Sequence, residues 1–479
     1  MDDEELIKFA QAFGQLAGEA FKLVKAPSTI PDMVADHLGV SASELPAIVD
    51  ALPAVERPNL QLALDALIAK NPESRLVGLS AELRHFGGFS IGALLAGTFR
   101  GPAEPVPPSY DELPIDVDRS LRCVTAGLWF VWLDDQPAVI GSFAADRHGP
   151  GDPEQRVEVV AATAAHGEAV VAELRRLRHE LNVYRKRVLA FTFSQYGEFG
   201  IDFLPRPGTT ASEVILPAAD LASIERHTIG VADQAEALRA RGQHLKRGLL
   251  LYGPPGTGKT HTISYLMAAM PERTVVVLQG ASVGALGQAA AIARAFPPSM
   301  LVIEDVDLIA SERAMPGMAN SNPLMFQLLN EMDGLAPTDD VLFVLTTNRL
   351  DMLEPALAAR PGRIDHAVEI ARPDEHGRAQ LLRLYLGDAA DQLGELPAVV
   401  ERTEGVTASF FKELVRRATL LAIDEADSDL TEAHIDIALA ELLDHAAPVM
   451  RAMLGLDTGD EIGVDRGSRP PMMPPPDWQ

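Results

Sequence analysis

The residues whose chemistry is clearest form a glycine-rich loop between an apolar run and a stretch that can form a helix. The loop reads Gly253, Pro254, Pro255, Gly256, Thr257, Gly258, Lys259 and Thr260, after the run 249–252 and before residues 261–270. Glycines let a backbone curl until its N–H groups converge on one point, and the following helix presents its positive N-terminal end to the same anion. The pattern predicts a P-loop, in which Lys259 pairs with the β- and γ-phosphates of a nucleotide and the Thr260 hydroxyl binds Mg²⁺.

Two carboxylates follow the next strand-like run. Residues 300–303 are continuously apolar, as in a strand buried on both faces of a sheet, and Glu304 and Asp305 come directly after them. Because open α/β sheets bind ligands at the carboxyl ends of their strands, these acids are expected beside the phosphates. One acid can hold the water shell of Mg²⁺, and its neighbour can orient the attacking water.

Polar side chains downstream fit the same site. Asn348 follows the buried run 341–347 and is expected to hydrogen-bond the γ-phosphate or the attacking water. Arg360 and Arg363 flank a Pro-Gly turn, where they cannot both easily serve a core. We expect them to project into a phosphate site of a neighbouring subunit as arginine fingers, the alternative being a solvated turn.

Together these motifs resemble the AAA family of ATPases, in the classical clade that has a second region of homology. The matching segments are GPPGTGKT at 253–260, LVIEDVD at 301–307, LLNEMDGL at 328–335, TTNR at 346–349, LEPALAARPGRID at 353–365 and TEGVTASFFKELVRRA at 403–418. They cover about residues 220–446. The resemblance implies hydrolysis of ATP with Mg²⁺ by a homo-oligomer, usually a hexameric ring with ATP at the subunit interfaces.

The resemblance also implies a role for each site residue. In the family register Glu304 of the Walker B strand faces the metal, with Thr260 of the Walker A loop, and Asp305 faces the attacking water. Asn348 looks like the sensor-1 residue. Arg360 and Arg363 look like the arginine fingers.

Three departures from the family pattern change what is expected. The family usually has Asp-Glu where this chain has Glu304-Asp305, so the water-positioning side chain is one methylene shorter. A misplacement of about 1 Å can cost on the order of a hundredfold in rate, so lower turnover is expected. Ala285 stands where threading relatives carry a pore aromatic, and residues 407–410 replace a common Gly-Ala-Asp. ATP hydrolysis is therefore expected more firmly than peptide threading.

Composition restricts the partners and the compartment. The chain has 479 residues, 68 of them acidic and 41 basic, and a formal net charge of −27, which disfavours nucleic acid and anionic membranes as partners. The single cysteine, Cys123, excludes an intramolecular disulfide framework. An acidic N-terminus and the lack of a long apolar span argue against a signal peptide or transmembrane segment, so a cytoplasmic protein is expected.

The expected fold class is α/β, a P-loop AAA core in which helices sandwich a parallel sheet, with further regions upstream. The expected parts are an N-terminal helical domain over 1–100, a Pro-rich linker over 101–114, an α/β middle domain over 115–215, the large ATPase subdomain over 216–372, a helical lid over 373–446, and a disordered Pro-rich tail over 447–479. The tail is alternatively a polyproline peptide for a partner, with Trp478 as its anchor.

Several elements upstream of the ATPase region are also predicted. An apolar stripe over 6–23 indicates a helix that packs in a bundle or docks a partner. Residues 34–52 faintly suggest a helix-turn-helix, but its second helix has no Lys or Arg to contact DNA. A hairpin over 122–143, a helix over 168–181 and a strand over 188–193 follow. Basic residues between 175 and 187 are expected to pair with nearby acids, or to dock an acidic partner.

The function expected from the sequence is remodelling or disassembly of a protein substrate or adaptor that residues 1–215 recognise. An ATP-gated scaffold that assembles on binding ATP and hydrolyses it poorly is the alternative. A DNA-acting ATPase would need salt-dependent DNA binding, which the net charge disfavours.

Overall fold

The computed structural model describes most of the chain and divides it into two compact units that alternate along the sequence. The described residues are 29–40, 45–79, 90–95, 104–144, 154–193, 199–307, 323–336, 339–350, 364–394, 396–425 and 429–444. The first unit comprises Met1–Pro205 with Arg273–Phe296, and the second comprises Arg206–Glu272 with Pro297–Gln479. Among the described residues, no helix is both long enough and apolar enough to cross a membrane.

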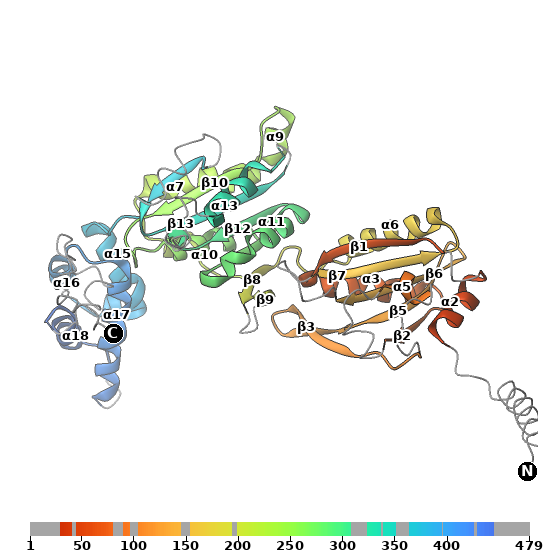
Figure 1. Cartoon of the computed structure of the whole chain (residues 1–479). Helices are drawn as coiled ribbons and strands as arrows, with labels where there is room; N and C mark the ends of the chain where they lie inside the picture. Colours follow the sequence, from red (N-terminus) through yellow and green to blue (C-terminus); the bar gives the residue numbers. More distant parts are fainter. Residues whose placement is uncertain are drawn as a thin grey trace, which may run out of the picture. The chain divides into compact units, whose positions relative to one another are not determined.

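An antiparallel sheet of five strands, in the order β1-β7-β6-β5-β2, is the centre of the first unit (Figure 1). The strands are β1 (Ala47–Pro53), β2 (Arg75–Gly78), β5 (Gly127–Leu133), β6 (Gln136–Ala144) and β7 (Glu154–Ala161). Asp134 and Asp135 connect β5 to β6 with φ angles of 50° and 59°. A two-residue turn with both φ angles positive matches the twist of a hairpin, and the predicted turn and return strand are confirmed here.

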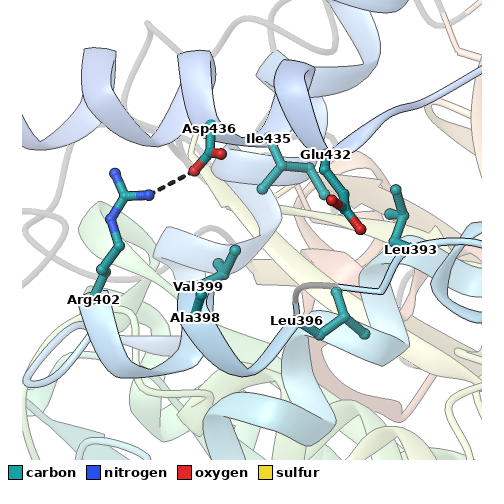
Figure 2. A pocket seen from close by; sticks show the side chains of 8 residues that line it. All are labelled: Leu393, Leu396, Ala398, Val399, Arg402, Glu432, Ile435 and Asp436. Atoms are coloured by element: carbon teal, nitrogen blue, oxygen red, sulfur yellow. Dashed lines mark hydrogen bonds and ion pairs between the residues drawn. The ribbon is translucent and has the colours of Figure 1, made fainter.

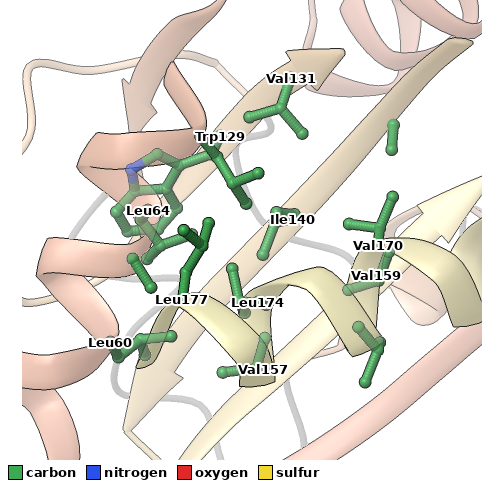
Figure 3. Packing of buried hydrophobic residues seen from close by; sticks show 14 of the residues in the cluster. Leu60, Leu64, Trp129, Val131, Ile140, Val157, Val159, Val170, Leu174 and Leu177 are labelled. Carbon is green, nitrogen blue, oxygen red and sulfur yellow. The ribbon is translucent and has the colours of Figure 1, made fainter. Parts of the chain in front are cut away.

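Helices pack on both faces of this sheet, and β5, β6 and β7 bury apolar residues on both sides. They are α2 (Ile30–Leu38), α3 (Arg57–Lys70), α5 (Ile91–Leu95) and α6 (Ala164–Glu180). Trp129 and Val131 of β5 point towards α3 and α6, as Figure 3 shows. The alternate residues Leu128 and Phe130 pack against α2 and α5 instead. This alternation follows from the two-residue period of a strand.

The structure corrects the expectation of a helical domain over 1–100. Strands β1 and β2 lie in that range and pair with β7 and β5, so residues on either side of the expected linker share one sheet. The second helix of the faint helix-turn-helix is strand β1, because Ile48 and Val49 belong to a short β-branched run that gains a ladder with β7. Within the expected linker, Val106 bridges Gly78, and β3 begins at Tyr110. The predicted stripe over 6–23 lies outside the described residues.

The first unit also contains a smaller set of strands. β3 (Tyr110–Asp116) and β4 (Arg119–Val124) form a two-stranded ribbon. β8 (Val188–Phe193), at the predicted position, pairs antiparallel with β9 (Phe199–Leu204) and parallel with β11 (Thr274–Leu278). After β11 come a 3₁₀ turn, η4 (Gly280–Ala285), and helix α11 (Leu286–Ala295). β11 lies within the range expected for the ATPase subdomain, and its partner β8 lies within the range expected for the middle domain.

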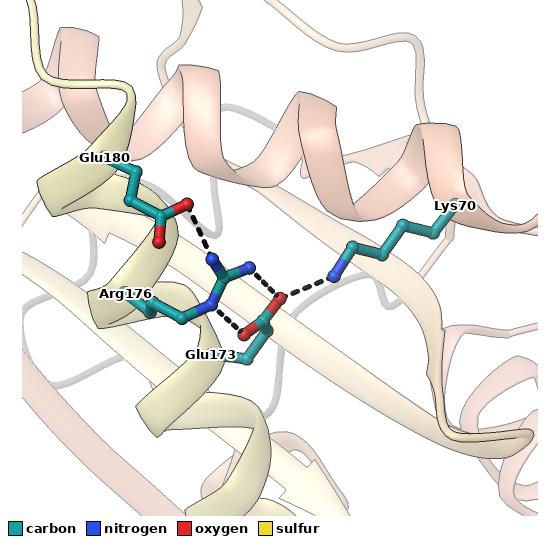
Figure 4. A network of polar contacts seen from close by, with 4 residues as sticks. All are labelled: Lys70, Glu173, Arg176 and Glu180. Carbon is teal, nitrogen blue, oxygen red and sulfur yellow. Dashed lines mark hydrogen bonds and ion pairs between the residues drawn. The ribbon is translucent and has the colours of Figure 1, made fainter.

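Acids of the first unit pair with most of the basic cluster. Glu173 accepts two bonds from the Arg176 guanidinium and one from Lys70, and Glu180 contacts Arg176 from the next turn (Figure 4). The further ion pairs are Arg175 and Arg178 with Asp50, and Arg187 with Asp116. The cluster is therefore largely neutralised within the unit, which favours the first of its two interpretations.

Four neighbouring parallel strands, in the order β14-β10-β13-β12, are the centre of the second unit. Its strands are β10 (Arg247–Tyr252), β12 (Ser299–Ile303), β13 (Val341–Thr347) and β14 (His366–Glu369), and the accompanying helices are α7 (Ala218–His227), α8 (Ile229–Asp233), α9 (Ala235–Ala240), α10 (Lys259–Ala269) and α13 (Pro323–Asp333). Every residue of β12 and β13 is buried, as predicted for strands covered on both faces.

Helices at the end of the described chain share a separate apolar core. They are α15 (Glu375–Leu386), α16 (Leu396–Arg402), α17 (Ala408–Asp424) and α18 (Glu432–Asp444), and we call them the lid helices. Phe410 and Phe411 of α17 are both fully buried there. Figure 2 shows a pocket between α16 and α18, where Arg402 pairs with Asp436 at 2.5 Å and so joins the two helices.

Candidate nucleotide-binding site

The glycine-rich loop lies between the end of β10 and the start of α10. Gly253, Gly256 and Gly258 all have positive φ angles, of 140°, 76° and 115°. At two of them the surroundings also exclude a side chain. A Cβ atom on Gly253 would lie 2.4 Å from the Ile370 carbonyl oxygen, and one on Gly256 would lie 2.3 Å from the Ser409 hydroxyl oxygen. Only glycine combines this backbone shape with this close approach.

Carbonyl and N–H groups of the loop have different surroundings. The carbonyls of Gly253 and Pro254 each accept a bond of 2.8 Å from Lys259, and those of Gly256 and Gly258 accept from backbone N–H groups at 3.0 and 2.9 Å. Within the described part of the chain, the backbone N–H groups of residues 256–260 form no hydrogen bond. Their donors remain available to an anion at the N-terminus of α10.

Lys259 supplies a buried positive charge beside these donors. Its side chain is only 7% exposed, and burial lowers its pKa, while the charges of Asp305 and Asp307 act in the opposite direction. The hydrogen-bond acceptors of its ammonium group are carbonyl oxygens, and no carboxylate of the described residues contacts it directly. A phosphate would neutralise its charge.

Glu304 and Asp305 have different partners. The Thr260 hydroxyl donates to Glu304 at 2.7 Å, whereas the Asn348 side-chain amide donates to Asp305 at 3.2 Å. Asp305 has a φ of 51°, and its N–H donates to the Thr346 hydroxyl at 2.9 Å, which holds the turn after β12 against β13. The structure thus brings the predicted Thr260, Glu304, Asp305 and Asn348 together at the carboxyl ends of neighbouring parallel strands.

This part of the chain matches a known family. A family model described as "ATPase family associated with various cellular activities (AAA)" matches residues 249–372, which include the loop, both acids and Asn348. The chain contains an AAA ATPase domain.

Curated relatives of the AAA domain are similar over part of their length. A proteasome-activating nucleotidase of Methanopyrus kandleri is 34% identical over 41% of this chain and 48% of its own. The 26S proteasome regulatory subunit 8 homolog of Schizosaccharomyces pombe is 30% identical over 43% and 55%, respectively. The ATP-dependent zinc metalloprotease FtsH 2 of Symbiobacterium thermophilum is 31% identical over 51% and 45%. The chain spans about half the length of these relatives.

The oxygen donors of the AAA domain fit Mg²⁺. Thr260 and Glu304 offer a hydroxyl and a carboxylate oxygen 2.7 Å apart, next to the open N–H groups. Among the described residues no group of three or more His, Cys, Asp or Glu side chains is placed to hold a metal ion. Mg²⁺ commonly takes one or two protein carboxylates and completes its shell with waters and substrate phosphates, so this small donor set is appropriate.

Asp307 supports the site in a way that the sequence did not indicate. Its carboxylate is buried and accepts from the Thr347 hydroxyl at 2.9 Å and from the Asn348 backbone N–H at 3.1 Å. These bonds fix the turn after β13 and, with it, the Asn348 amide that contacts Asp305. The only signal in the sequence is an acid two positions after Asp305, at the end of the same apolar run.

Two lid residues next to the loop were also missed as contributors. Thr407 and Ser409 lie at the start of α17, and their hydroxyl oxygens are 3.0 Å apart. The Ser409 N–H donates to the Gly256 carbonyl at 3.0 Å. The sequence marked these positions only as a departure from the family pattern, because a contact across about 150 residues leaves no local periodicity to read.

The remaining predicted residues lie either outside the described residues or in the first unit. Arg360 and Arg363 lie outside the described residues. Ala285, expected where relatives carry a pore aromatic, and its neighbour Leu286 are 1% and 0% exposed in the first unit. A charged side chain in place of Leu286 would therefore destabilise that unit. Ala281, in the same segment, is exposed.

Proposed function

We propose that this chain is a Mg²⁺-dependent ATP hydrolase. The observation that carries the proposal is the loop before α10, which directs free N–H groups and the buried Lys259 cation towards the edge where Glu304 and Asp305 emerge. A bound triphosphate needs N–H donors and a cation at its phosphates, with carboxylates nearby to hold the metal ion and the attacking water. Enzymes catalyse phosphoryl transfer mainly by positioning these groups and stabilising charge.

Each residue has a distinct role in the proposal. Lys259 binds the β- and γ-phosphates, and Thr260 and Glu304 hold the metal ion. Mg²⁺, when bound, neutralises charge on the phosphate oxygens. Asp305 orients the attacking water and accepts its proton, while Asn348 holds the Asp305 carboxylate in place and reaches the γ-phosphate. Glu304 contacts Thr260, whereas Asp305 contacts Asn348, and these different partners support different roles for the two acids.

The assembly that we propose is a homo-oligomeric ring, because an arginine finger acts on the nucleotide of another subunit. Arg360 and Arg363 would act on the nucleotide of the neighbouring subunit, and six subunits are expected from the resemblance to the classical AAA clade. The match of residues 249–372 to the AAA family model supports this arrangement.

The substrate that we propose is a protein, which the enzyme remodels or disassembles in the cytoplasm. Two similar relatives are named after the proteasome and a third is named as an ATP-dependent protease. The N-terminal 215 residues would recognise the substrate or its adaptor. Burial of Ala285 and Leu286 supports remodelling over threading, since neither side chain can grip a peptide.

Steady-state ATPase assays across protein concentration test the function. We expect Mg²⁺-dependent turnover whose specific activity rises with concentration as the shared sites form, with Lys259→Ala as the inactive control. The second candidate is an ATP-gated scaffold, which is favoured by the short Asp305 carboxylate on a backbone with a φ of 51°. A scaffold would assemble on adding ATP but hydrolyse it no faster than the Lys259→Ala control.

A further inference from the structure

The first turn of lid helix α17 is in direct contact with the P-loop. Ser409, the second residue of the helix, donates its backbone N–H to the Gly256 carbonyl at 3.0 Å. We propose that Ser409 is a positioning residue, which through this bond aims the Thr257 N–H at the nucleotide phosphates. The inference rests on the proposed binding of ATP by the same loop.

The peptide group between Gly256 and Thr257 is planar. The Gly256 carbonyl and the Thr257 N–H belong to one peptide group, and in a trans peptide they point in opposite directions. Fixing the carbonyl towards the lid therefore fixes the Thr257 N–H away from it. Gly256 has a φ of 76°, and glycine allows this peptide group to rotate at little cost, so without the bond the orientation would be weakly held.

The start of α17 is built for this contact. The first N–H groups of a helix lack partners within the helix and are commonly bonded by the side chain of the preceding residue. Thr407 occupies that position, yet its side chain forms no such capping bond. Its hydroxyl pairs instead with that of Ser409 at 3.0 Å, and Thr407 is fully buried. The Ser409 N–H is therefore bonded by the P-loop.

The P-loop and the start of α17 lie very close to each other. A Cβ atom on Gly256 would lie 2.3 Å from the Ser409 hydroxyl oxygen and 3.2 Å from that of Thr407. A rotation of the lid that breaks the bond would release the carbonyl and misdirect the Thr257 N–H. Because coupling between sites is reciprocal, ATP on the loop should in turn hold the lid against it.

A proline substitution at Ser409 tests its backbone N–H, and an alanine substitution tests its hydroxyl. Ser409→Pro removes the donor, and α2 and α3 of this chain already carry proline at the same second helical position. The matched control is Ala408→Pro, one residue earlier, where the extended backbone of Thr407 suits a following proline and the Ser409 N–H is kept. Ser409→Ala keeps the N–H and removes only the hydroxyl pair. All three variants are compared by thermal melting before use.

Calorimetric titration of the full chain with ATP and Mg²⁺ gives the main result. Loss of one hydrogen bond predicts about three- to tenfold weaker binding for Ser409→Pro, a smaller loss of about twofold for Ser409→Ala, and parental affinity for Ala408→Pro. Equal affinity of Ser409→Pro and the parent would overturn the inference. Failure of the parent itself to bind ATP would instead overturn the proposed function.

Hydrogen exchange on the unaltered chain provides a second measurement that needs neither ATP nor a folded variant. An N–H in the first turn of a helix usually exchanges fast, so the bond to Gly256 should slow exchange at Ser409 at least about tenfold relative to Ala408. Equal exchange rates at the two positions would contradict the contact, even if Ser409→Pro failed to fold.

Discussion

Lys259 has two tasks at the residue scale. Its ammonium group bonds the Gly253 and Pro254 carbonyls, each at 2.8 Å, and so keeps these oxygens away from an incoming anion. The same group brings a buried positive charge to the phosphates. One side chain thus shapes the loop and attracts the ligand.

Removing this side chain should abolish ATP binding. Lys259→Ala takes away the charge and both carbonyl contacts, and charge-assisted bonds to phosphate are among the strongest in proteins. Calorimetry with ATP and Mg²⁺ checks the result, with Lys412→Ala on an exposed position of α17 as the control. An unchanged affinity for Lys259→Ala would refute the assignment of the loop.

The two acids should respond differently to loss of charge. Asp305→Asn should bind ATP normally and lower the hydrolysis rate about a hundredfold or more, since it removes the acceptor for the proton of the attacking water. Glu304→Gln should first raise the Mg²⁺ concentration required, because its partner is the Thr260 hydroxyl. Rates and Mg²⁺ titrations measure both effects.

Asp305→Glu is the most informative change at this position. It restores the reach that is usual in the family, so we expect hydrolysis at or above the parental rate. Parental turnover in Asp305→Asn would show that another acid positions the water, and Asp307 would be tested next.

Site residues within short motifs could be predicted, whereas residues brought in by the fold could not. Lys259, Glu304 and Asn348 each follow a strand-like run, and the strand order places those run ends side by side. Asp307 and Ser409 act through a backbone turn and a helix start, and their partners lie 41 and about 150 residues away. The periodicity of a sequence indicates local structure and does not reveal contacts between residues so far apart.

At the scale of elements, segments with a clear local signal could be predicted from the sequence, whereas β1 could not. Helix α6 and the β5–β6 hairpin have an amphipathic face and a two-residue turn, respectively, which are local signals. β1 has one β-branched pair and a mixed exposure pattern, and only its ladder with β7 makes it a strand. Where the local preference was weak, pairing with a strand distant in the sequence therefore determined the secondary structure.

Acid should weaken the link between α3 and α6 that Glu173 forms. The hydrogen bonds from Arg176 lower the pKa of Glu173 to about 2 from its ordinary 4.5, with Lys70 contributing in the same direction. A lowered pKa stabilises the fold above pH 4.5, and this contribution is lost as the pH falls towards 2. Glu173→Gln should therefore lower the free energy of unfolding by about 0.5–1 kcal/mol at pH 7.

Denaturant unfolding at several pH values checks this expectation. The difference between Glu173→Gln and the parent should shrink below pH 4.5 and vanish near pH 2. Glu168→Gln, at an exposed position of the same helix, is the control and should show no such pH dependence. A difference that stays constant with pH would mean that packing, not charge, accounts for the effect.

At the scale of the whole molecule, the proposed ring makes the active site a shared one. Arg360→Ala or Arg363→Ala should leave ATP binding nearly intact and depress turnover about a thousandfold, because a finger acts chiefly on charge in the transition state. Mixing either variant with Lys259→Ala should restore some activity, since a mixed ring contains interfaces with both parts intact. Activity independent of concentration, down to monomeric samples, would contradict a shared site.

The alternation of the two units along the chain has a consequence for synthesis on the ribosome. β8 needs β11 as its parallel neighbour, yet the whole segment from Arg206 to Glu272, with the P-loop, is made in between. At about 5–20 residues per second, the span from 205 to 296 takes roughly 5–18 s. During that interval the nascent first unit exposes one edge of β8, and an unpaired strand edge is a site of misassembly. The emerging chain should therefore depend on chaperones most strongly until β11 has been made, which happens only after its P-loop is complete.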